Sequence, residues 1–226
     1  EKLQVSWSPP KFTLPANPEE LYTYLKNTKS FTTLKGVEKG NPTATFEKAS
    51  KRYETSYRWP FQLHGMIGPS CSIADVRGDQ VTIWSGCQGP FRIRAAVASL
   101  LKIPETNVRV IYRDGSGSYG RLSSDDSPED AALLSRAVGA PVRIQWSRHD
   151  EHGWEPKGPA QTQSLRAGVD DTGKIISWEF TDYSFPWTVA SATTLLASEQ
   201  IGIKSKSPGQ GNGNQGSGEI YAFENI

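Results

Sequence analysis

Along residues 81–148, segments with the hydrophobic pattern of a strand alternate with segments that have the pattern of a helix. Short apolar runs typical of strands occur at VTIWS (81–85), NVRVIYR (107–113) and PVRIQWS (141–147). Between the first two runs, Ile93, Val97, Leu100 and Leu101 recur at helical spacing and share one face. The order strand, glycine turn, helix, strand, glycine turn, helix, strand predicts βαβ-like units.

Start and stop signals set the ends of two further helices. Asn17 can cap a helix that begins at Pro18 and runs roughly to Leu25. In the segment SPEDAALLSRAVG (127–139), Ser127 is the expected N-cap, and the final glycine ends the helix.

Strand-like runs on either side of turn residues predict antiparallel hairpins. CSIADV (71–76) and QVTIWS (80–85) flank Arg77-Gly78-Asp79, and TQSLRAGV (162–169) and KIISWEFTDY (174–183) flank DDTG (170–173). YETSYRW (53–59) alternates as a strand does, LQVSW (3–7) reads as a short strand, and LHGMIGP (63–69) reads as irregular. We therefore expect an α+β (mixed α/β) fold that combines βαβ-like units with antiparallel hairpins.

Composition narrows the class of protein. The chain has 226 residues, 36% of them hydrophobic and 22% charged, which is typical of one large or two small globular domains. A net charge of +1 gives no strong field that would attract nucleic acid. No apolar run is long enough to span a bilayer, and the start carries no secretory signal. The Gly- and Ser-rich stretch 204–218 is expected to be mobile.

Cysteine and histidine do not form a recognisable site. Cys71 and Cys87 are too few for a disulfide scaffold and fit no zinc spacing, so we expect two buried thiols. His149 and His152 flank Glu151 and suggest a metal site, but the sequence supplies no further ligand.

The first glycine motif, GSGSYG (115–120), fits the spacing G-x-G-x-x-G and follows a strand. A dinucleotide-binding site would have its helix open at the third glycine, whereas RLSSDDSP intervenes here. This departure disfavours a dinucleotide site, which stays open beside two other interpretations, a purely structural turn and a cradle for another cofactor.

The second motif is the turn GCQGP (86–90), which places Gln88 between two glycines at the mouth of a helix. A glutamine amide both donates and accepts hydrogen bonds, so it can orient an oxo or hydroxo ligand. The helix N-terminus favours an anionic group. The alternative, equally open, is that Gln88 caps the turn and contacts only water.

Residues 61–183 resemble the molybdopterin-binding large subunit of the xanthine dehydrogenase and aldehyde oxidase family, and within it the isoquinoline 1-oxidoreductase beta-subunit type. The resemblance rests on five segments: LHGMIGPSC, WSGCQGPFRIRAAVA, VRVIYRDGSGSYGR, DDSPEDAALLSRAVGAPVRIQWSRHDEHGWEPKGPA and LRAGVDDTGKIISWE. The family resemblance implies a molybdenum hydroxylase, an oxidoreductase that oxidises an aldehyde or an N-heterocycle with oxygen derived from water. It implies a molybdenum–molybdopterin cofactor in the cytosine dinucleotide form.

The resemblance also implies partners and a location. They are an iron–sulfur small subunit that carries the clusters, the remainder of the same large subunit, and a cytochrome c as candidate electron acceptor; no nucleic-acid partner is expected. The family branch suggests a bacterial protein that is periplasmic, or attached to the membrane from the periplasm, rather than cytoplasmic.

By the same resemblance, Gln88 matches the glutamine that hydrogen-bonds an oxygen ligand of molybdenum. Tyr119 and Gly120 match an aromatic–glycine pair whose backbone approaches the metal centre, and Gly117 and Ser118 lie in the same cofactor-binding loop. Phe91 is a candidate wall of the substrate pocket. No residue here is expected to bind the metal directly.

The sequence departs from the family at several positions. Ser123 stands near the place of an acidic purine-reading residue, and Gly68 stands where many members have glutamate. The general-base glutamate is expected outside these 226 residues, so the chain alone is expected to be inactive. The alternative interpretation is a degenerate scaffold or partner-binding module of the same fold.

The expected division of the chain has three parts. Residues 1–58 are the end of a hammerhead-like domain and a linker, residues 59–203 are the first molybdopterin-binding domain, and residues 204–226 are a flexible loop with the start of a following segment.

Overall fold

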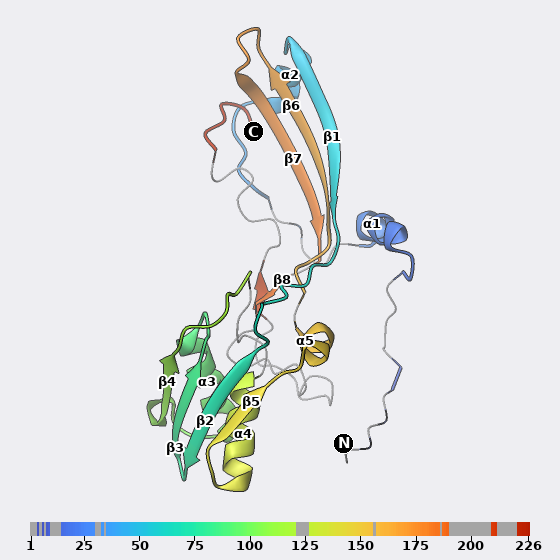
Figure 1. Cartoon of the computed structure of the whole chain (residues 1–226). Coiled ribbons are helices and arrows are strands. Elements are labelled where there is room, and N and C mark those ends of the chain that lie inside the picture. Colours follow the sequence, from blue (N-terminus) through green and yellow to red (C-terminus); the bar gives the residue numbers. More distant parts are fainter. Residues whose placement is uncertain are drawn as a thin grey trace. The chain divides into compact units, whose positions relative to one another are not determined.

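The computed structural model describes residues 15–29, 33, 35–120, 127–155, 157–185, 187–189, 209–211 and 221–226, with the isolated residues 4, 6, 8 and 9. The chain forms two compact units (Figure 1). The first unit consists of residues 1–60, 160–185 and 213–226, and the second of residues 61–159 and 186–212.

The first unit is built on an antiparallel sheet of three strands, in the order β1-β6-β7. The strands are β1 (Lys51–Trp59), β6 (Gln161–Val169) and β7 (Ile175–Ser184), and β6 and β7 form the hairpin that the turn residues 170–173 predict. Helices α1 (Pro18–Asn27) and α2 (Pro42–Glu47) belong to the same unit. Each has an asparagine cap: Asn17 accepts from the backbone N–H of Glu19, and Asn41 from that of Ala44, both at 3.0 Å.

Arg166 on β6 joins three elements of this unit. Its guanidinium pairs with Glu47 of α2 and Glu54 of β1, both at 3.3 Å, and with Glu179 of β7. It also lies 4.1 Å from the centre of the Phe46 ring. Because Arg166 has several partners in fixed geometry, this cluster fixes the positions of α2, β1 and β7 around β6 more firmly than a single exposed ion pair would.

Asp182 on β7 is a carboxyl group that the fold buries at a cost. Burial raises its pKa from 3.8 to about 6, with a smaller opposing effect from Gln163. The unfolded chain ionises at lower pH than the folded chain, so the folded state is increasingly disfavoured as the pH rises from about 4 to 6.

We therefore predict that Asp182→Asn, which cannot ionise, stabilises the protein at neutral pH. The gain should reach at most about 3 kcal/mol above about pH 7 and shrink towards zero near about pH 4. Urea unfolding of both proteins at the two pH values measures the gain. An equal difference at both values would show that Asp182 does not titrate as argued.

The second unit contains a sheet of four strands in the order β4-β3-β2-β5. The strands are β2 (Cys71–Arg77), β3 (Gln80–Ser85), β4 (Val108–Tyr112) and β5 (Val142–Gln145), and its helices are α3 (Pro90–Leu101), α4 (Ser127–Val138) and α5 (Arg148–Trp154). The 3-10 helix η1 spans Glu105–Asn107. Strands β2 and β3 form the predicted hairpin. Strands β3 and β4 pair in parallel, and the chain between them contains α3. The predicted mixed fold, with a βαβ unit and antiparallel hairpins, is confirmed.

The core of this unit lies between the sheet and the helices α3 and α4. It consists of alternating residues from the strands and one face of each helix, and Figure 1 shows both helices alongside the sheet. Its buried members are Ala74, Val76, Val81, Ile83, Cys87, Ile93, Val97, Ala98, Leu101, Val108, Ala131 and Ala132. None of the helices in the described part of the chain is long and apolar enough to cross a bilayer.

Three expectations differ from the structure or lie outside it. Ser127 is the first residue of α4 rather than its cap, and its buried hydroxyl contacts those of Ser70 and Ser72 at 2.9 and 3.0 Å. Cys71 is only half-buried, although Cys87 is buried as expected. The expected strand at residues 3–7 lies largely outside the described residues.

The stretch 204–218 contains one described element, strand β9 (Gly209–Gly211), which pairs with β8 (Trp187–Val189). Apart from these three residues, the stretch lies outside the described residues, and its expected mobility stays a prediction. The β6–β7 hairpin belongs to the same compact unit as β1, whereas the sequence-based division assigned it to the domain of residues 59–203. That division concerns the domains of a longer protein and stays a prediction.

Candidate functional site

In the turn after β3, Gln88 faces solvent, and the preceding residue, Cys87, is buried in the core. Cys87 is buried in the core, at 3% exposure, while Gln88 is exposed. Burial raises the pKa of the Cys87 thiol, so it remains protonated and acts as an apolar anchor. Gly89 precedes α3, and no side chain caps the helix. The first-turn N–H groups of α3 therefore suit an anionic or polar ligand.

The loop after β4, residues 115–120, has a backbone that requires glycine at two positions. Gly117 has φ +97° and Gly120 has φ +114°, and Tyr119 between them adopts φ +48°. Such left-handed conformations are costly for residues with a Cβ atom. A methyl group at Gly117 would lie 3.0 Å from two ring carbons of Tyr119, so this ring lies close over the loop backbone.

The structure brings the two glycine motifs together. Strands β3 and β4 are parallel neighbours, so the turns that follow them emerge at the same edge of the sheet. There the Gln88 side chain Nε2 donates a hydrogen bond to Ser118 Oγ at 3.2 Å. The alternative in which Gln88 contacts only water is therefore wrong.

The remaining candidate residues lie close by in the chain. Gly117, Tyr119 and Gly120 flank Ser118 in the same loop. Phe91 lies in the first turn of α3 and is 78% exposed, so it could contact a ligand without rearrangement. The dinucleotide interpretation is not supported, because α4 begins at Ser127 rather than at Gly120.

An open pocket of about 320 Å³ lies beside these turns, on the face of the sheet opposite the helices. Cys71, Ile73 and Trp84 line it because they alternate with the core residues of β2 and β3. Gly86, Gly115 and Ser116, which flank Gln88 and Ser118 along the chain, also line it. We did not select these strand residues from the sequence, although their alternation with the core positions was a usable signal.

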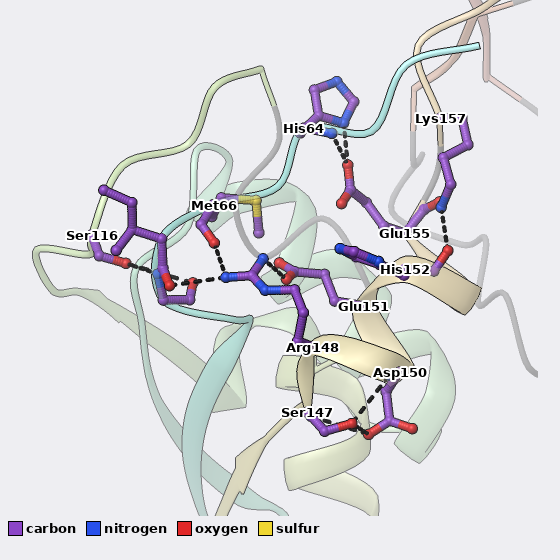
Figure 2. Close-up of polar contacts among 12 residues, drawn as sticks. His64, Met66, Ser116, Ser147, Arg148, Asp150, Glu151, His152, Glu155 and Lys157 are labelled. Atoms are coloured by element: carbon purple, nitrogen blue, oxygen red, sulfur yellow. Dashed lines mark hydrogen bonds and ion pairs between the residues drawn. The ribbon is translucent and has the colours of Figure 1, made fainter.

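The residues around α5 form a second polar cluster, shown in Figure 2. Ser147 and Asp150 cap the helix reciprocally: Ser147 Oγ accepts from the backbone N–H of Asp150 at 3.1 Å, and Asp150 Oδ2 accepts from that of Ser147 at 3.0 Å. Glu151 is buried and pairs with Arg148. Among the described residues, no group of three or more histidine, cysteine and acidic side chains could hold a metal ion. The metal site suggested at His149, Glu151 and His152 is thus not formed.

The site residues fit a large cofactor that carries polar and anionic groups. Gln88 and Ser118 supply neutral hydrogen-bonding groups, the left-handed glycine loop exposes backbone amides, and the uncapped start of α3 adds partial positive charge. At Gly117 and Gly120, the rings of Tyr119 and His64 occupy the space that a Cβ atom would take, so glycine is needed at both positions.

Comparison with known proteins identifies the family. Residues 25–185 match the model of the molybdopterin cofactor-binding domain. The chain is 39% identical over 195 residues to a nicotinate dehydrogenase subunit of Pseudomonas putida, covering 86% of this chain and 16% of that protein. It is 34% identical over 137 residues to the aldehyde oxidoreductase molybdenum-binding subunit of Escherichia coli, covering 60% of this chain and 19% of that protein. The chain thus spans less than a fifth of either relative.

Solved structures show the same fold at low sequence identity. The aldehyde oxidoreductase of Desulfovibrio gigas matches with a TM-score of 0.56 at 16% identity, over 63% of this chain and 16% of that one. Quinoline 2-oxidoreductase of Pseudomonas putida 86 matches with a TM-score of 0.56 at 20% identity, over 66% of this chain and 20% of that one. The chain belongs to the molybdopterin cofactor-binding domain family, of the kind found in the xanthine dehydrogenase and aldehyde oxidase subunits.

Proposed function

We propose that this chain forms one wall of the molybdenum–molybdopterin site in a hydroxylase of N-heterocycles or aldehydes. The observation that carries the proposal is the hydrogen bond from Gln88 to Ser118, which joins the two glycine motifs at one edge of the sheet. The relatives support it, because nicotinate dehydrogenase and aldehyde oxidoreductase subunits share this segment of sequence.

The reaction replaces a substrate C–H bond by C–OH. The oxygen comes from water, and two electrons and two protons leave. When bound, the molybdenum cofactor supplies the oxygen transfer and takes up the electrons. The protein has to bind the cofactor, orient its polar groups and shape the space for substrate.

Gln88 is the residue we propose for orienting an oxygen ligand. Its bond to Ser118 fixes which way the amide faces before any ligand arrives, so little reorganisation is needed on binding. Tyr119 and Gly120 would contribute backbone amides, and Phe91 would form an apolar wall for an aromatic substrate.

Several finer assignments belong to the same proposal. The relatives from Pseudomonas putida and Eubacterium barkeri are both named as subunits of a nicotinate dehydrogenase, which implies a multi-subunit complex. We propose that the complex of this protein comprises the remainder of the large subunit and an iron–sulfur small subunit, with a cytochrome c as acceptor. The cytosine dinucleotide form of the cofactor and the periplasmic location also remain proposals, which rest on the family resemblance.

Isotope labelling of the intact enzyme tests the reaction class. Nicotinate or an aromatic aldehyde is oxidised in H₂¹⁸O under ordinary oxygen, and in ordinary water under ¹⁸O₂. The proposal predicts one labelled oxygen from water and none from O₂ in the product. Label from O₂, or no hydroxylated product from either class of substrate, would contradict it.

A further inference from the structure

An irregular stretch of chain between β1 and β2 contacts both α5 and the loop that follows β4. We call residues 64–68 the bridging segment and residues 115–120 the glycine loop. Figure 2 shows the bridging segment held on one side by α5 and the residues that follow it, and reaching Ser116 on the other. All of these residues belong to the second compact unit.

The first anchor is His64. Glu155 Oε1 accepts a hydrogen bond from the backbone N–H of His64 at 2.7 Å and also contacts its ring Nδ1. This double contact fixes the orientation of the ring. The opposite edge then faces the loop: a methyl group on Gly120 would lie 2.6 Å from His64 Cδ2 and 3.0 Å from Nε2.

The second anchor lies at the other end of the segment. Arg148 donates to the backbone carbonyl groups of Met66 and Ile67, the latter at 2.9 Å. One residue further on, the backbone N–H of Gly68 donates to Ser116 Oγ at 2.6 Å. A methyl group on Gly68 would lie 2.4 Å from that oxygen, so a side chain at position 68 and this contact exclude each other.

The first anchor, the contact between His64 and Glu155, lies in a buried part of the second unit. Glu155 is 3% exposed and the Met66 side chain is fully buried. A buried carboxylate is costly unless it is hydrogen-bonded, so moving His64 away would leave Glu155 without its partners. His64 and Glu155 are therefore expected to hold one arrangement rather than several.

We propose that the bridging segment is a positioning element for the glycine loop. His64, oriented by Glu155, supports Gly120, while Gly68 holds Ser116, so that the loop is fixed near both of its ends. His64 is thus a positioning residue. The consequence for a bound cofactor rests on the proposed function above, whereas the effect on the loop itself does not.

Hydrogen exchange of the loop amides in the intact protein tests the proposal, whether or not the protein carries molybdenum. We expect His64→Ala and Glu155→Ala to speed exchange in residues 115–120 about tenfold, with the β2–β3 hairpin unchanged. Glu155→Gln should restore most of the protection, because an amide oxygen can accept both bonds. His149→Ala, an exposed change on the neighbouring helix α5, should have no effect.

Two results would overturn the proposal. One is unchanged loop exchange in His64→Ala. The other is faster exchange throughout the second unit, which would show a general loss of stability. If His64→Ala does not fold, Ser116→Ala tests the second anchor at an exposed hydrogen bond, with an expected rise of about fivefold in the loop. Unchanged exchange in that variant would equally contradict the proposal.

Discussion

Replacing Gln88 with alanine will lower turnover by the intact enzyme about 100-fold, which is the loss typical for one preorganised hydrogen-bond donor at a reacting centre. Gln88 is exposed and the neighbouring Cys87 anchors the turn, so the change should leave folding and molybdenum content unaltered. The measurement is steady-state turnover per molybdenum atom, compared with the wild type.

Two control variants sharpen this prediction. Gln80→Ala removes an exposed glutamine at the β2–β3 hairpin, away from the site, and should have no effect on turnover. Ser118→Ala removes the partner that orients Gln88 and should cost about fivefold, as expected for one lost hydrogen bond. Unchanged turnover in Gln88→Ala would instead show that Gln88 takes no part in the reaction.

Gly120→Ala is expected to be the most destabilising single methyl addition in the glycine loop. The left-handed φ of +114° disfavours any Cβ atom, and the new methyl would overlap the His64 ring at 2.6 Å. Together, the backbone strain and the overlap should lower the free energy of unfolding by about 3 kcal/mol, or displace the loop. Urea unfolding followed by tryptophan fluorescence measures the loss.

Gly139→Ala is the matched control, because Gly139 also has a left-handed φ, +66°, but open space around its Cα. It should cost only about 1 kcal/mol, from the backbone conformation alone. Adding His64→Ala to Gly120→Ala should relieve the overlap but not the strain. Equal losses for Gly120→Ala and Gly139→Ala would show that His64 does not pack against the loop.

Local signals predicted most elements of the fold. The hairpin turn at Gly78, the cap at Asn17 and the apolar face of α3 each act over a few residues, and the structure contains all three elements. Ser127 shows the limit of such rules, because its hydroxyl is taken up by Ser70 and Ser72, which are distant in sequence. The antiparallel pairing of β5 with β2 is likewise a long-range choice that no local pattern specifies.

The candidate site was only partly accessible from the sequence. Glycine spacing indicated the two turns, and the family resemblance supplied the roles of Gln88 and Tyr119. Their meeting depends on the parallel pairing of β3 and β4. The contact between His64 and Glu155 joins residues 91 positions apart, and neither residue has a local pattern that marks it as part of a site.

The central claim is that this chain contributes to a molybdenum–molybdopterin site. Its most direct test is the molybdenum and pterin content of the intact protein purified from its native host. We predict about one molybdenum atom per chain and a releasable pterin dinucleotide, as expected for one cofactor site. A well-folded intact protein without molybdenum or pterin would contradict the claim and leave the glycine turns as structural features alone.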